Sequence, residues 1–526
     1  MNLSQFFDHW RIAENPFRGE EARHDEVFAR MERGGGGPGG VGGAGVTSRH
    51  SDFDKIVGEL TRCATSVVFG EKGSGKTAIR LQLAAKITEH NEKIGHSGGR
   101  VMLVSYDELN RFLDQFYARH SGGSKPADVA EVFSKIRLVD HMDGILSLAV
   151  GRLVNGLLGG GGEPPAADLG PDAWKKARSM PPALKRDLLA LQAVYDPCDP
   201  DGKRTRTLRR KLRLGASRGS LLWGAATWLG WAPVAAALWW VLFRFEGTEG
   251  WTYTAAQGVA IAVGAAYLGV LGKTQLLDRL AARRWGRRLH RQLRMLGRSA
   301  EAYAGSVKHL GPVMRNTQVL PTSKSDEPRY AMLDRLRRVA DHLGIQGVIV
   351  VIDRVDEPTL INGDAERMRH VIWPLFNNKF LQQERFGLKL LLPIELRYAL
   401  FKESNAFFQE ARLDKQNLVE RLVWTGATLY DLCNARLAAC LVDGATGISL
   451  LDLFSEDVTR QDVVDALDQM HQPRDAFKFI YRCLNEHCSN VTAEEGAWRV
   501  PRLVLEHIRK QEADRVQQLE RGIRPA

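Results

Sequence analysis

Hydrophobic positions along the chain fall into short continuous runs separated by longer stretches with helical spacing. The runs are rich in β-branched and aliphatic residues, which is typical of strands buried on both faces of a sheet. Apolar residues at helical spacing follow the first run at 78–87 and precede the third run at 330–342. This alternation predicts a three-layer α/β fold, with helices on both faces of a sheet. The predicted strands are 66–69, 101–109, 348–352 and 388–396.

Two further apolar stretches have a different character. Residues 221–243 and 253–271 contain no ionisable side chain apart from Tyr253 and Tyr267. As a helix the first would span about 34 Å, enough for a hydrocarbon layer of about 30 Å. The pair therefore predicts a two-helix transmembrane hairpin. A pair of buried core helices is the alternative, and Pro233 within the first stretch favours it.

The positive charge of the chain is concentrated on either side of this hairpin. The formal net charge is +11, and residues 201–219 carry eight basic residues and one acidic residue, while 272–298 carry nine and one. The remainder is therefore net negative, which argues against nucleic acid as the main partner. Short basic flanks stay on the cytoplasmic side, so we expect an inner (cytoplasmic) membrane protein with the bulk of the chain cytoplasmic.

Composition changes divide the chain into six stretches. A helical lead-in ends in a glycine-rich linker at 34–45, and a Gly/Pro-rich break at 159–170 interrupts a helical insertion. We expect a sheet domain in two halves, split by this insertion and by the hairpin, and followed by a helical C-terminal lid. The predicted bounds are 1–50 for the lead-in and linker, 51–120 and 299–400 for the two halves, 121–202 for the insertion, 203–298 for the hairpin with its basic flanks, and 401–526 for the lid.

The six cysteines are dispersed and form no C-x-x-C pair. This spacing argues against a disulfide framework and against a zinc cluster, and it favours reduced cytosolic thiols. Cys483 and Cys488 flank His487, but without a second pair nearby we interpret them as helix-packing residues.

The strongest motif follows the first predicted strand. Residues 70–77 read GEKGSGKT, a complete G-x-x-x-x-G-K-[ST] pattern between a strand and a helix. Its glycines let consecutive backbone N–H groups surround phosphate oxygens at a helix N-terminus. Lys76 is expected to bridge the outer phosphates and to act in catalysis, and Thr77 to ligate Mg²⁺. The predicted phosphate-binding residues are Gly70, Glu71, Lys72, Gly73, Ser74, Gly75, Lys76 and Thr77.

A second candidate motif ends the third strand, where residues 348–357 read VIVVIDRVDE. A phosphoryl-transfer site of this kind needs an acidic metal ligand and a carboxylate that orients water. Asp353 is our candidate for the metal, and Glu357 for the catalytic base, with Asp356 as the second choice. The alternative interpretation is a solvated acidic turn after a core strand.

Other site residues rest on weaker signals. Glu395, at the end of the fourth run, could sense the γ-phosphate. Arg474 begins a predicted helix in the C-terminal region and is a candidate nucleotide-contacting arginine. Three further arginines could act as an arginine finger, and the sequence does not separate them: Arg397, Arg412 and Arg421.

The absence of a guanine-recognition motif after Asp353 indicates which nucleotide base is bound. A guanine-specific site needs [NT]KxD on a loop after the metal-binding aspartate, and no such string follows Asp353. The nearest string, SKSD at 323–326, precedes it in a proline-bounded linker. ATP with Mg²⁺ is therefore the expected ligand.

These motifs, with a membrane hairpin inserted between them, resemble the KAP-type NTPases, and the resemblance covers roughly residues 51–482. The segment IDRVDE differs from the usual adjacent acidic pair of that family, since Arg354 stands in the second place. More broadly the chain is similar to P-loop ATPases with an extra strand and a catalytic glutamate, including the AAA and STAND types. This resemblance implies a membrane-anchored ATPase with a helical lid over residues 418–488.

The sequence thus predicts a P-loop ATPase that couples Mg-ATP hydrolysis to a conformational or assembly change at the membrane. Homo-oligomerisation or protein partners are expected through the lid and the insertion. One alternative is a nucleotide-switched scaffold with little hydrolysis. Another is a soluble AAA-type ATPase that handles nucleic acid through its Arg-rich arms, with the apolar stretches as core helices.

Overall fold

The chain folds into two compact units in a computed structural model. The first comprises residues 1–93, 105–107 and 348–526, and the second comprises 94–104 and 108–347. Segments far apart in sequence therefore share a unit, and the N-terminal lead-in groups with the C-terminal third of the chain. The structure describes residues 1–18, 22–32, 49–95, 98–121, 128–159, 162–215, 218–244, 251–310, 320–442, 445 and 447–520.

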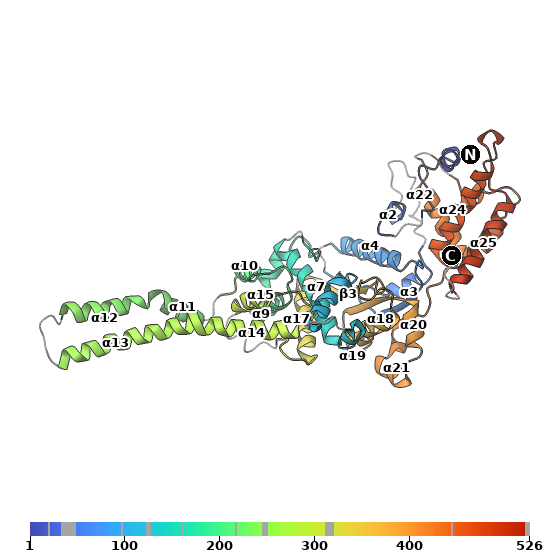
Figure 1. The fold of residues 1–526 in the computed structure, drawn as a ribbon. Helices are drawn as coiled ribbons and strands as arrows, with labels where there is room; N and C mark the ends of the chain where they lie inside the picture. Colours follow the sequence, from blue (N-terminus) through green and yellow to red (C-terminus); the bar gives the residue numbers. More distant parts are fainter. Residues whose placement is uncertain are drawn as a thin grey trace. The chain divides into compact units, whose positions relative to one another are not determined.

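A five-stranded parallel sheet forms the framework (Figure 1). Its order is β2-β3-β4-β1-β5, so β4 separates β1 from β3. This topology, with flanking helices, is consistent with a P-loop-like α/β fold and confirms the α/β prediction. The strands are β1 (Ser66–Gly70), β2 (Arg100–Ser105), β3 (Ile345–Ile352), β4 (Phe386–Pro393) and β5 (Asn417–Val419).

Each of the four predicted strands overlaps a strand of the structure, with small differences at the ends. The fourth run stops being a strand at Pro393, and Ile394 begins a helix. The three-residue β5 was not predicted, and it comes from the range that the sequence assigned to the helical lid. It pairs with β1 from Ser66↔Asn417 to Val68↔Val419. A three-residue strand is too short to show a periodic pattern.

β4 is buried along its whole length, as expected for a strand covered on both faces. Its one charged residue, Lys389, is fully buried. The Lys389 ammonium donates to the carbonyl oxygens of Ile56 (2.7 Å), Val57 (2.9 Å) and Ala64 (2.7 Å). These bonds connect the centre of the sheet to the segment that leads into β1.

Helices of the first unit flank the sheet and form a helical C-terminal region. α4 (Lys76–Ile94) follows β1 through the glycine-rich loop. Several short elements connect the later strands: α3 (Phe53–Val57), α18 (Ala365–Ile372), η2 (Trp373–Leu375), α19 (Asn378–Leu381), α20 (Ile394–Leu400), α21 (Asn405–Ala411) and η3 (Leu413–Lys415). The C-terminal region, residues 426–520, contains α22 (Gly426–Ala439), η4 (Leu450–Leu453), α23 (Arg460–Asp468), α24 (Pro473–Asn490), η5 (Ala493–Glu495) and α25 (Arg502–Glu520).

The N-terminal residues 1–18 and 22–32, here called the arm, pack into the core of this C-terminal region. The arm contains α1 (Leu3–His9) and α2 (Glu26–Glu32), and its Phe6 and Phe17 are buried in the same cluster as Leu437. Backbone and side-chain bonds add to this contact. Ala13 N–H donates to Cys440 O (2.8 Å), and the indole of Trp10 donates to the carbonyl of Trp498 (2.8 Å).

Helices of the second unit surround a core formed by α7 (Leu138–Leu158), α9 (Pro182–Tyr195) and α17 (Glu327–Leu343). A buried polar group lies in this core: Arg329 pairs with Asp143 (3.1 Å), which also accepts from the Tyr195 hydroxyl (2.8 Å). Among the described residues of this unit, the other helices outside the hairpin are α5 (Leu109–His120), α6 (Val129–Phe133), α8 (Ala173–Ser179), α10 (Lys203–Lys211), α14 (Asp278–Gln292) and α15 (Ala300–Lys308).

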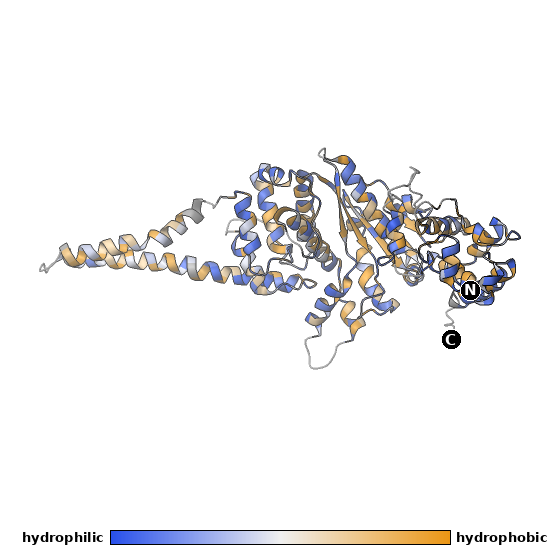
Figure 2. Ribbon diagram, turned by 90° about the horizontal axis from the view of Figure 1, so that it is seen from above, coloured by the Kyte–Doolittle hydropathy of each residue, from blue (hydrophilic) through white to orange (hydrophobic). Residues whose placement is uncertain are grey.

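The two apolar stretches form a helical hairpin within the second unit (Figures 1 and 2). Its first arm is α11 (Arg218–Leu229) and α12 (Trp231–Arg244), and its second is α13 (Trp251–Leu271), which continues through the π-helical turn η1 (Gly272–Leu277) into α14. Pro233 lies in the first turn of α12, where a missing N–H is tolerated.

Leu222–Phe243 and Thr254–Gln292 are long and apolar enough to cross a membrane, on length and composition alone. That criterion is weak by itself, since a core helix also meets it. Here only 6% of each apolar window is buried within the described structure. Trp228 and Trp251 are 78% and 85% exposed. The two stretches are therefore not packed as core helices among the described residues.

The residues on either side of the hairpin are connected by buried hydrogen bonds. Arg298 donates to the carbonyl oxygens of Ala193 and Asp199, both at 2.9 Å, and to the hydroxyl of Ser306 (2.7 Å). The Asp199 carboxylate accepts from Ser306 (3.0 Å). Arg298 belongs to the second basic segment, so part of the charge counted there is used inside the fold.

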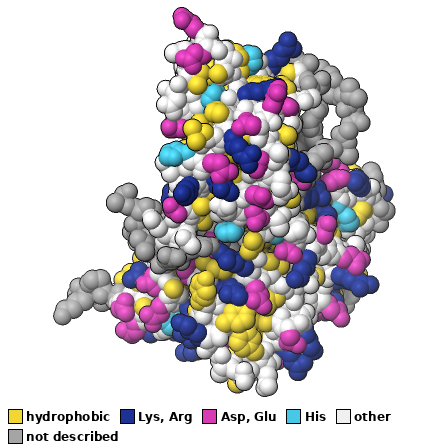
Figure 3. All heavy atoms as spheres, turned by 90° about the vertical axis from the view of Figure 1, so that its right-hand side faces the viewer, with side chains coloured by type: hydrophobic (Ala, Val, Ile, Leu, Met, Phe, Trp, Pro, Cys, Tyr) yellow, Lys and Arg dark blue, Asp and Glu magenta, His cyan; other side chains and the backbone are white. Residues whose placement is uncertain are grey.

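On one face of the molecule, surface charges of both signs are mixed (Figure 3). On the face drawn in Figure 3, Lys and Arg side chains are interspersed with Asp and Glu. A mixed surface of this kind favours solubility and does not form a continuous track for phosphates on the face shown.

Candidate functional site

The loop between β1 and α4 has the backbone conformation that its glycines predict. Gly73 and Gly75 have φ of 102° and 94°, a region that residues with a Cβ rarely occupy. Ser74 is buried, and its hydroxyl donates to Glu71 O (2.8 Å) within the loop. The loop is thus closed on itself immediately before α4 begins at Lys76.

Thr77 and Asp353, which are 276 positions apart in sequence, meet beside this loop. The Thr77 hydroxyl donates to Asp353 Oδ2 at 3.2 Å. Asp353 immediately follows β3 and is 1% exposed. The two predicted metal ligands are therefore brought together across the sheet order, although β4 lies between their strands.

Lys76 lies next to this pair. Its ammonium donates to the carbonyl oxygens of Gly70 (2.7 Å) and Glu71 (2.8 Å). Burial lowers the pKa of Lys76, and the nearby carboxylates, first that of Asp353, oppose the shift. Burial raises the pKa of Asp353, against the opposing charges of Arg80 and Lys76. A partly buried cation and a buried anion thus support each other's charged forms at the start of α4.

The two candidate bases follow Asp353 on the same turn. Asp356 and Glu357 line the cavity described below, and so does Glu395 from the first turn of α20. Glu357 forms an ion pair with Arg354, whose φ of 60° is unusual for a residue with a side chain. Arg354, at the place where the sequence departs from an acidic pair, thus holds the preferred candidate base.

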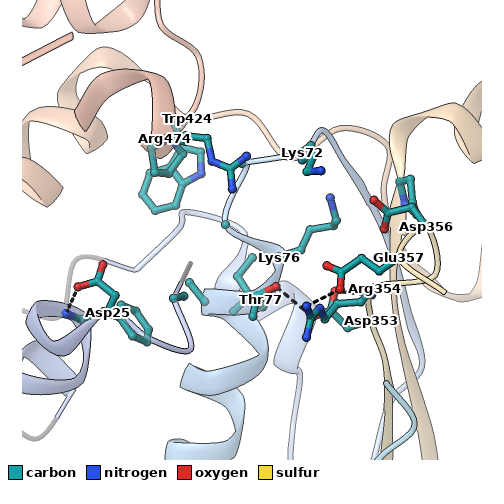
Figure 4. A pocket seen from close by; sticks show the side chains of 18 of the residues that line it. Asp25, Lys72, Lys76, Thr77, Asp353, Arg354, Asp356, Glu357, Trp424 and Arg474 are labelled. Carbon is teal, nitrogen blue, oxygen red and sulfur yellow. Dashed lines mark hydrogen bonds and ion pairs between the residues drawn. The ribbon is translucent and has the colours of Figure 1, made fainter. Parts of the chain in front are cut away.

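These residues surround a cavity of about 750 Å³, within the size range of small-molecule sites (Figure 4). Lys72, Gly73, Gly75, Lys76 and Thr77 line it. Gly70, Glu71 and Ser74 of the same motif do not line it: Gly70 pairs with Pro393 of β4, and Glu71 and Ser74 contact residues that follow β5. The other lining residues include Asp25, Phe28, Asp353, Asp356, Glu357, Glu395, Trp424, Arg436, Arg474 and Phe477.

Residues that follow β5 contact the loop between β1 and α4 at Glu71, Gly73 and Ser74. The Trp424 indole donates to Ser74 O (2.9 Å), and Arg421 pairs with Glu71 (2.6 Å). Gln472 also donates to Glu71. Arg474 lies against Gly73, because a Cβ on that glycine would be 3.1 Å from the Cβ of Arg474. The sequence singled out Arg421 and Arg474 but missed Trp424 and Gln472, which belong to no motif.

Other candidates lie outside the cavity. Arg397 pairs with Glu420 (2.9 Å), and Arg412 ends α21. Cys483 and Cys488 are buried in the hydrophobic core of the C-terminal region, as their interpretation as packing residues predicts.

The donor set at Thr77 and Asp353 fits Mg²⁺ in the way that nucleotide sites usually bind it. Mg²⁺ takes oxygen ligands, and such sites supply one or two protein ligands beside phosphate and water oxygens. Among the described residues, no cluster of three or more His, Cys, Asp or Glu side chains could hold a metal alone. The residues present therefore suit a metal that arrives with a triphosphate.

The five-stranded parallel sheet with its flanking helices is consistent with a P-loop-like α/β fold. Comparison with protein-family models, with curated proteins and with solved structures found no match for this chain.

Proposed function

We propose that this chain is a membrane-anchored P-loop ATPase that binds Mg-ATP at residues 70–77 and hydrolyses it. The observation that carries this proposal is the 3.2 Å hydrogen bond between Thr77 and Asp353. It joins the hydroxyl of a complete phosphate-binding motif to an acidic side chain from another strand, inside a cavity that Lys76 also lines. Hydrophobic packing alone does not explain why a phosphate-binding loop, a cation and two oxygen ligands lie at one point.

Each residue has a specific role in this proposal. Lys76 exchanges its loop carbonyls for β- and γ-phosphate oxygens and stabilises charge that develops during transfer. Thr77 and Asp353 hold Mg²⁺, which neutralises negative charge on the same phosphates. Glu357, or Asp356 in its place, orients the attacking water and accepts its proton. Arg474 contacts the nucleotide from the start of α24.

The exposed hairpin supports the membrane part of the proposal. Its two apolar arms expose large aromatic and aliphatic side chains, and basic segments flank both ends. In a bilayer those side chains would be buried, and the basic flanks would remain on the cytoplasmic side. The proposed site then lies in the cytoplasm at the inner membrane, where hydrolysis drives a conformational or assembly change.

A second candidate function is favoured by one contact. Arg354 pairs with Glu357, which restrains the carboxylate expected to orient water. If that pair persists with nucleotide bound, the chain acts as a nucleotide-switched scaffold that retains ATP and hydrolyses it slowly. The two functions share the binding residues and differ only in turnover.

The test is phosphate release by the purified full-length chain with Mg-ATP. We expect Lys76→Ala to reduce turnover at least 100-fold, because developing charge loses its principal cation. Glu357→Gln is expected to reduce kcat by 10²-fold or more while ATP binding persists. Lys93→Ala is the matched control, since Lys93 lies near the other end of α4 and pairs with Glu89 on the surface.

The results separate the alternatives. Unchanged turnover in Lys76→Ala would refute the site assignment. Tight ATP retention with negligible release by the unmodified chain would favour the scaffold. A strong loss in Asp356→Asn with little loss in Glu357→Gln would transfer the role of base to Asp356.

A further inference from the structure

The cavity extends beyond the phosphate-binding loop to a part made by the arm and the C-terminal region. Ala22, Asp25 and Phe28 of the arm line it, together with Leu432 of α22 and Phe477 of α24. In Figure 4, Asp25 lies on the opposite side of the loop from Asp356 and Glu357. This part of the cavity therefore combines apolar and aromatic side chains with Asp25, on the side away from Asp356 and Glu357 (Figure 4).

Arg436 is the unusual residue of this part. It lines the cavity but is only 2% exposed. Its Nε donates to Pro16 O (2.6 Å), and its Nη1 donates to Asp25 Oδ2 (2.6 Å). Its Nη2 is buried and has no hydrogen-bond partner among the described residues.

An unsatisfied donor on a buried cation is costly, and a ligand acceptor would remove that cost. The guanidinium carbon lies 4.5 Å from the centroid of the Phe477 ring, so the donor is presented beside a flat aromatic surface. Phe28 supplies a second ring to the cavity wall. Two rings and one unsatisfied donor suit a flat heteroaromatic group with a ring nitrogen acceptor.

We propose that this part of the cavity is the base subsite, where Arg436 Nη2 donates to a ring nitrogen of adenine and Phe28 and Phe477 pack on the base. This inference rests on the proposed function, since it assumes that a triphosphate occupies the loop. Asp25 is a positioning residue: its carboxylate holds the guanidinium and accepts from Phe28 N–H (3.0 Å) at the start of α2. The arm thereby becomes part of the nucleotide site.

The test compares two ligands that share the phosphate chemistry, ATP and inorganic tripolyphosphate. Their affinities are measured by calorimetry with Mg²⁺ on the purified full-length chain. Phe28→Ala is the principal variant because Phe28 is only partly buried, and Arg436→Gln removes the donor at greater risk to folding. Met31→Ala is the control, since Met31 lies on the same helix and packs on the core without lining the cavity.

We expect Phe28→Ala to weaken ATP binding by about tenfold, within the range for loss of one base–aromatic contact. Tripolyphosphate affinity stays unchanged, and Met31→Ala alters neither ligand. Equal ATP affinity in Phe28→Ala and the unmodified chain, or equal losses for both ligands, would overturn the base subsite while leaving the phosphate site intact. If the unmodified chain binds neither ligand, the proposed function fails first and the subsite with it.

Discussion

Lys389 is a buried charge at the centre of the sheet, outside the candidate site. Burial lowers its pKa to about 7. Its three carbonyl partners lie on the segment 56–64, so the side chain connects β4 to the residues that lead into β1 and the phosphate-binding loop. A positive charge at this position is held by backbone oxygens rather than by a carboxylate.

This lowered pKa has a consequence for the pH dependence of stability. The folded chain releases the Lys389 proton near pH 7, whereas the unfolded chain keeps it up to about pH 10. Above pH 7 the unfolded state therefore binds one more proton, and the free energy of unfolding rises with pH by up to about 1.4 kcal/mol per unit. Denaturant unfolding of the unmodified chain and Lys389→Met between pH 6.5 and 8.5 measures this. The free energy of unfolding of the unmodified chain minus that of Lys389→Met should increase with pH. A value that stays constant over this range would contradict the prediction.

Some site residues belong to local sequence motifs and could be predicted, whereas others belong to no motif and could not. Residues 70–77 and Asp353 are local patterns attached to strands, and the structure brings Lys76, Thr77 and Asp353 together as the patterns predict. Trp424, Asp25 and Arg436 belong to no motif, because their place at the cavity depends on how distant segments pack. Their identities become informative only once the contacts are known.

At the scale of elements, the packing of the arm was the hardest feature to predict from the sequence. The pattern predicts short helices followed by a glycine-rich linker, and α1 and α2 do form. The partner of the arm could not be predicted, since Phe6 and Phe17 enter a core whose members outside the arm lie more than 400 positions later. Strand prediction succeeded for the opposite reason, because each long strand carries its own continuous apolar run.

The depth of this packing predicts that the arm stays bound when its covalent link is cut. A protease site inserted between Gly34 and Gly45 leaves the buried phenylalanines and the Arg436–Asp25 pair (2.6 Å) untouched. After cleavage, the N-terminal peptide should co-elute with the rest of the chain in size-exclusion chromatography. Phe6→Ala in the same background should weaken this association, since a buried ring is lost. Separate elution of the peptide from the otherwise unmodified chain would contradict the prediction.

At the scale of the whole molecule, the hairpin belongs to the second unit, and hydrogen bonds outside its apolar arms connect the segments on either side of it. Arg298 and Asp199 connect the segments before and after it. Within the hairpin, the Thr227 hydroxyl donates to that of Thr274 (3.2 Å), so the two arms are adjacent at that level. The chain can therefore be reconnected there without separating the residues that hold the base of the hairpin.

This arrangement predicts that membrane attachment can be removed separately from nucleotide binding. Replacing residues 228–273 with a four-residue Gly/Ser linker leaves only residues 221–227 of the first apolar stretch, too few to cross a bilayer of about 30 Å. The full-length chain should resist carbonate extraction from membranes, whereas the shortened chain should be released and should bind Mg-ATP within about twofold of the original affinity. Release of the full-length chain by carbonate would refute the proposed membrane anchor and favour the alternative of a soluble ATPase. Loss of ATP binding in a shortened chain with an unchanged thermal unfolding transition would mean that the hairpin takes part in the nucleotide site.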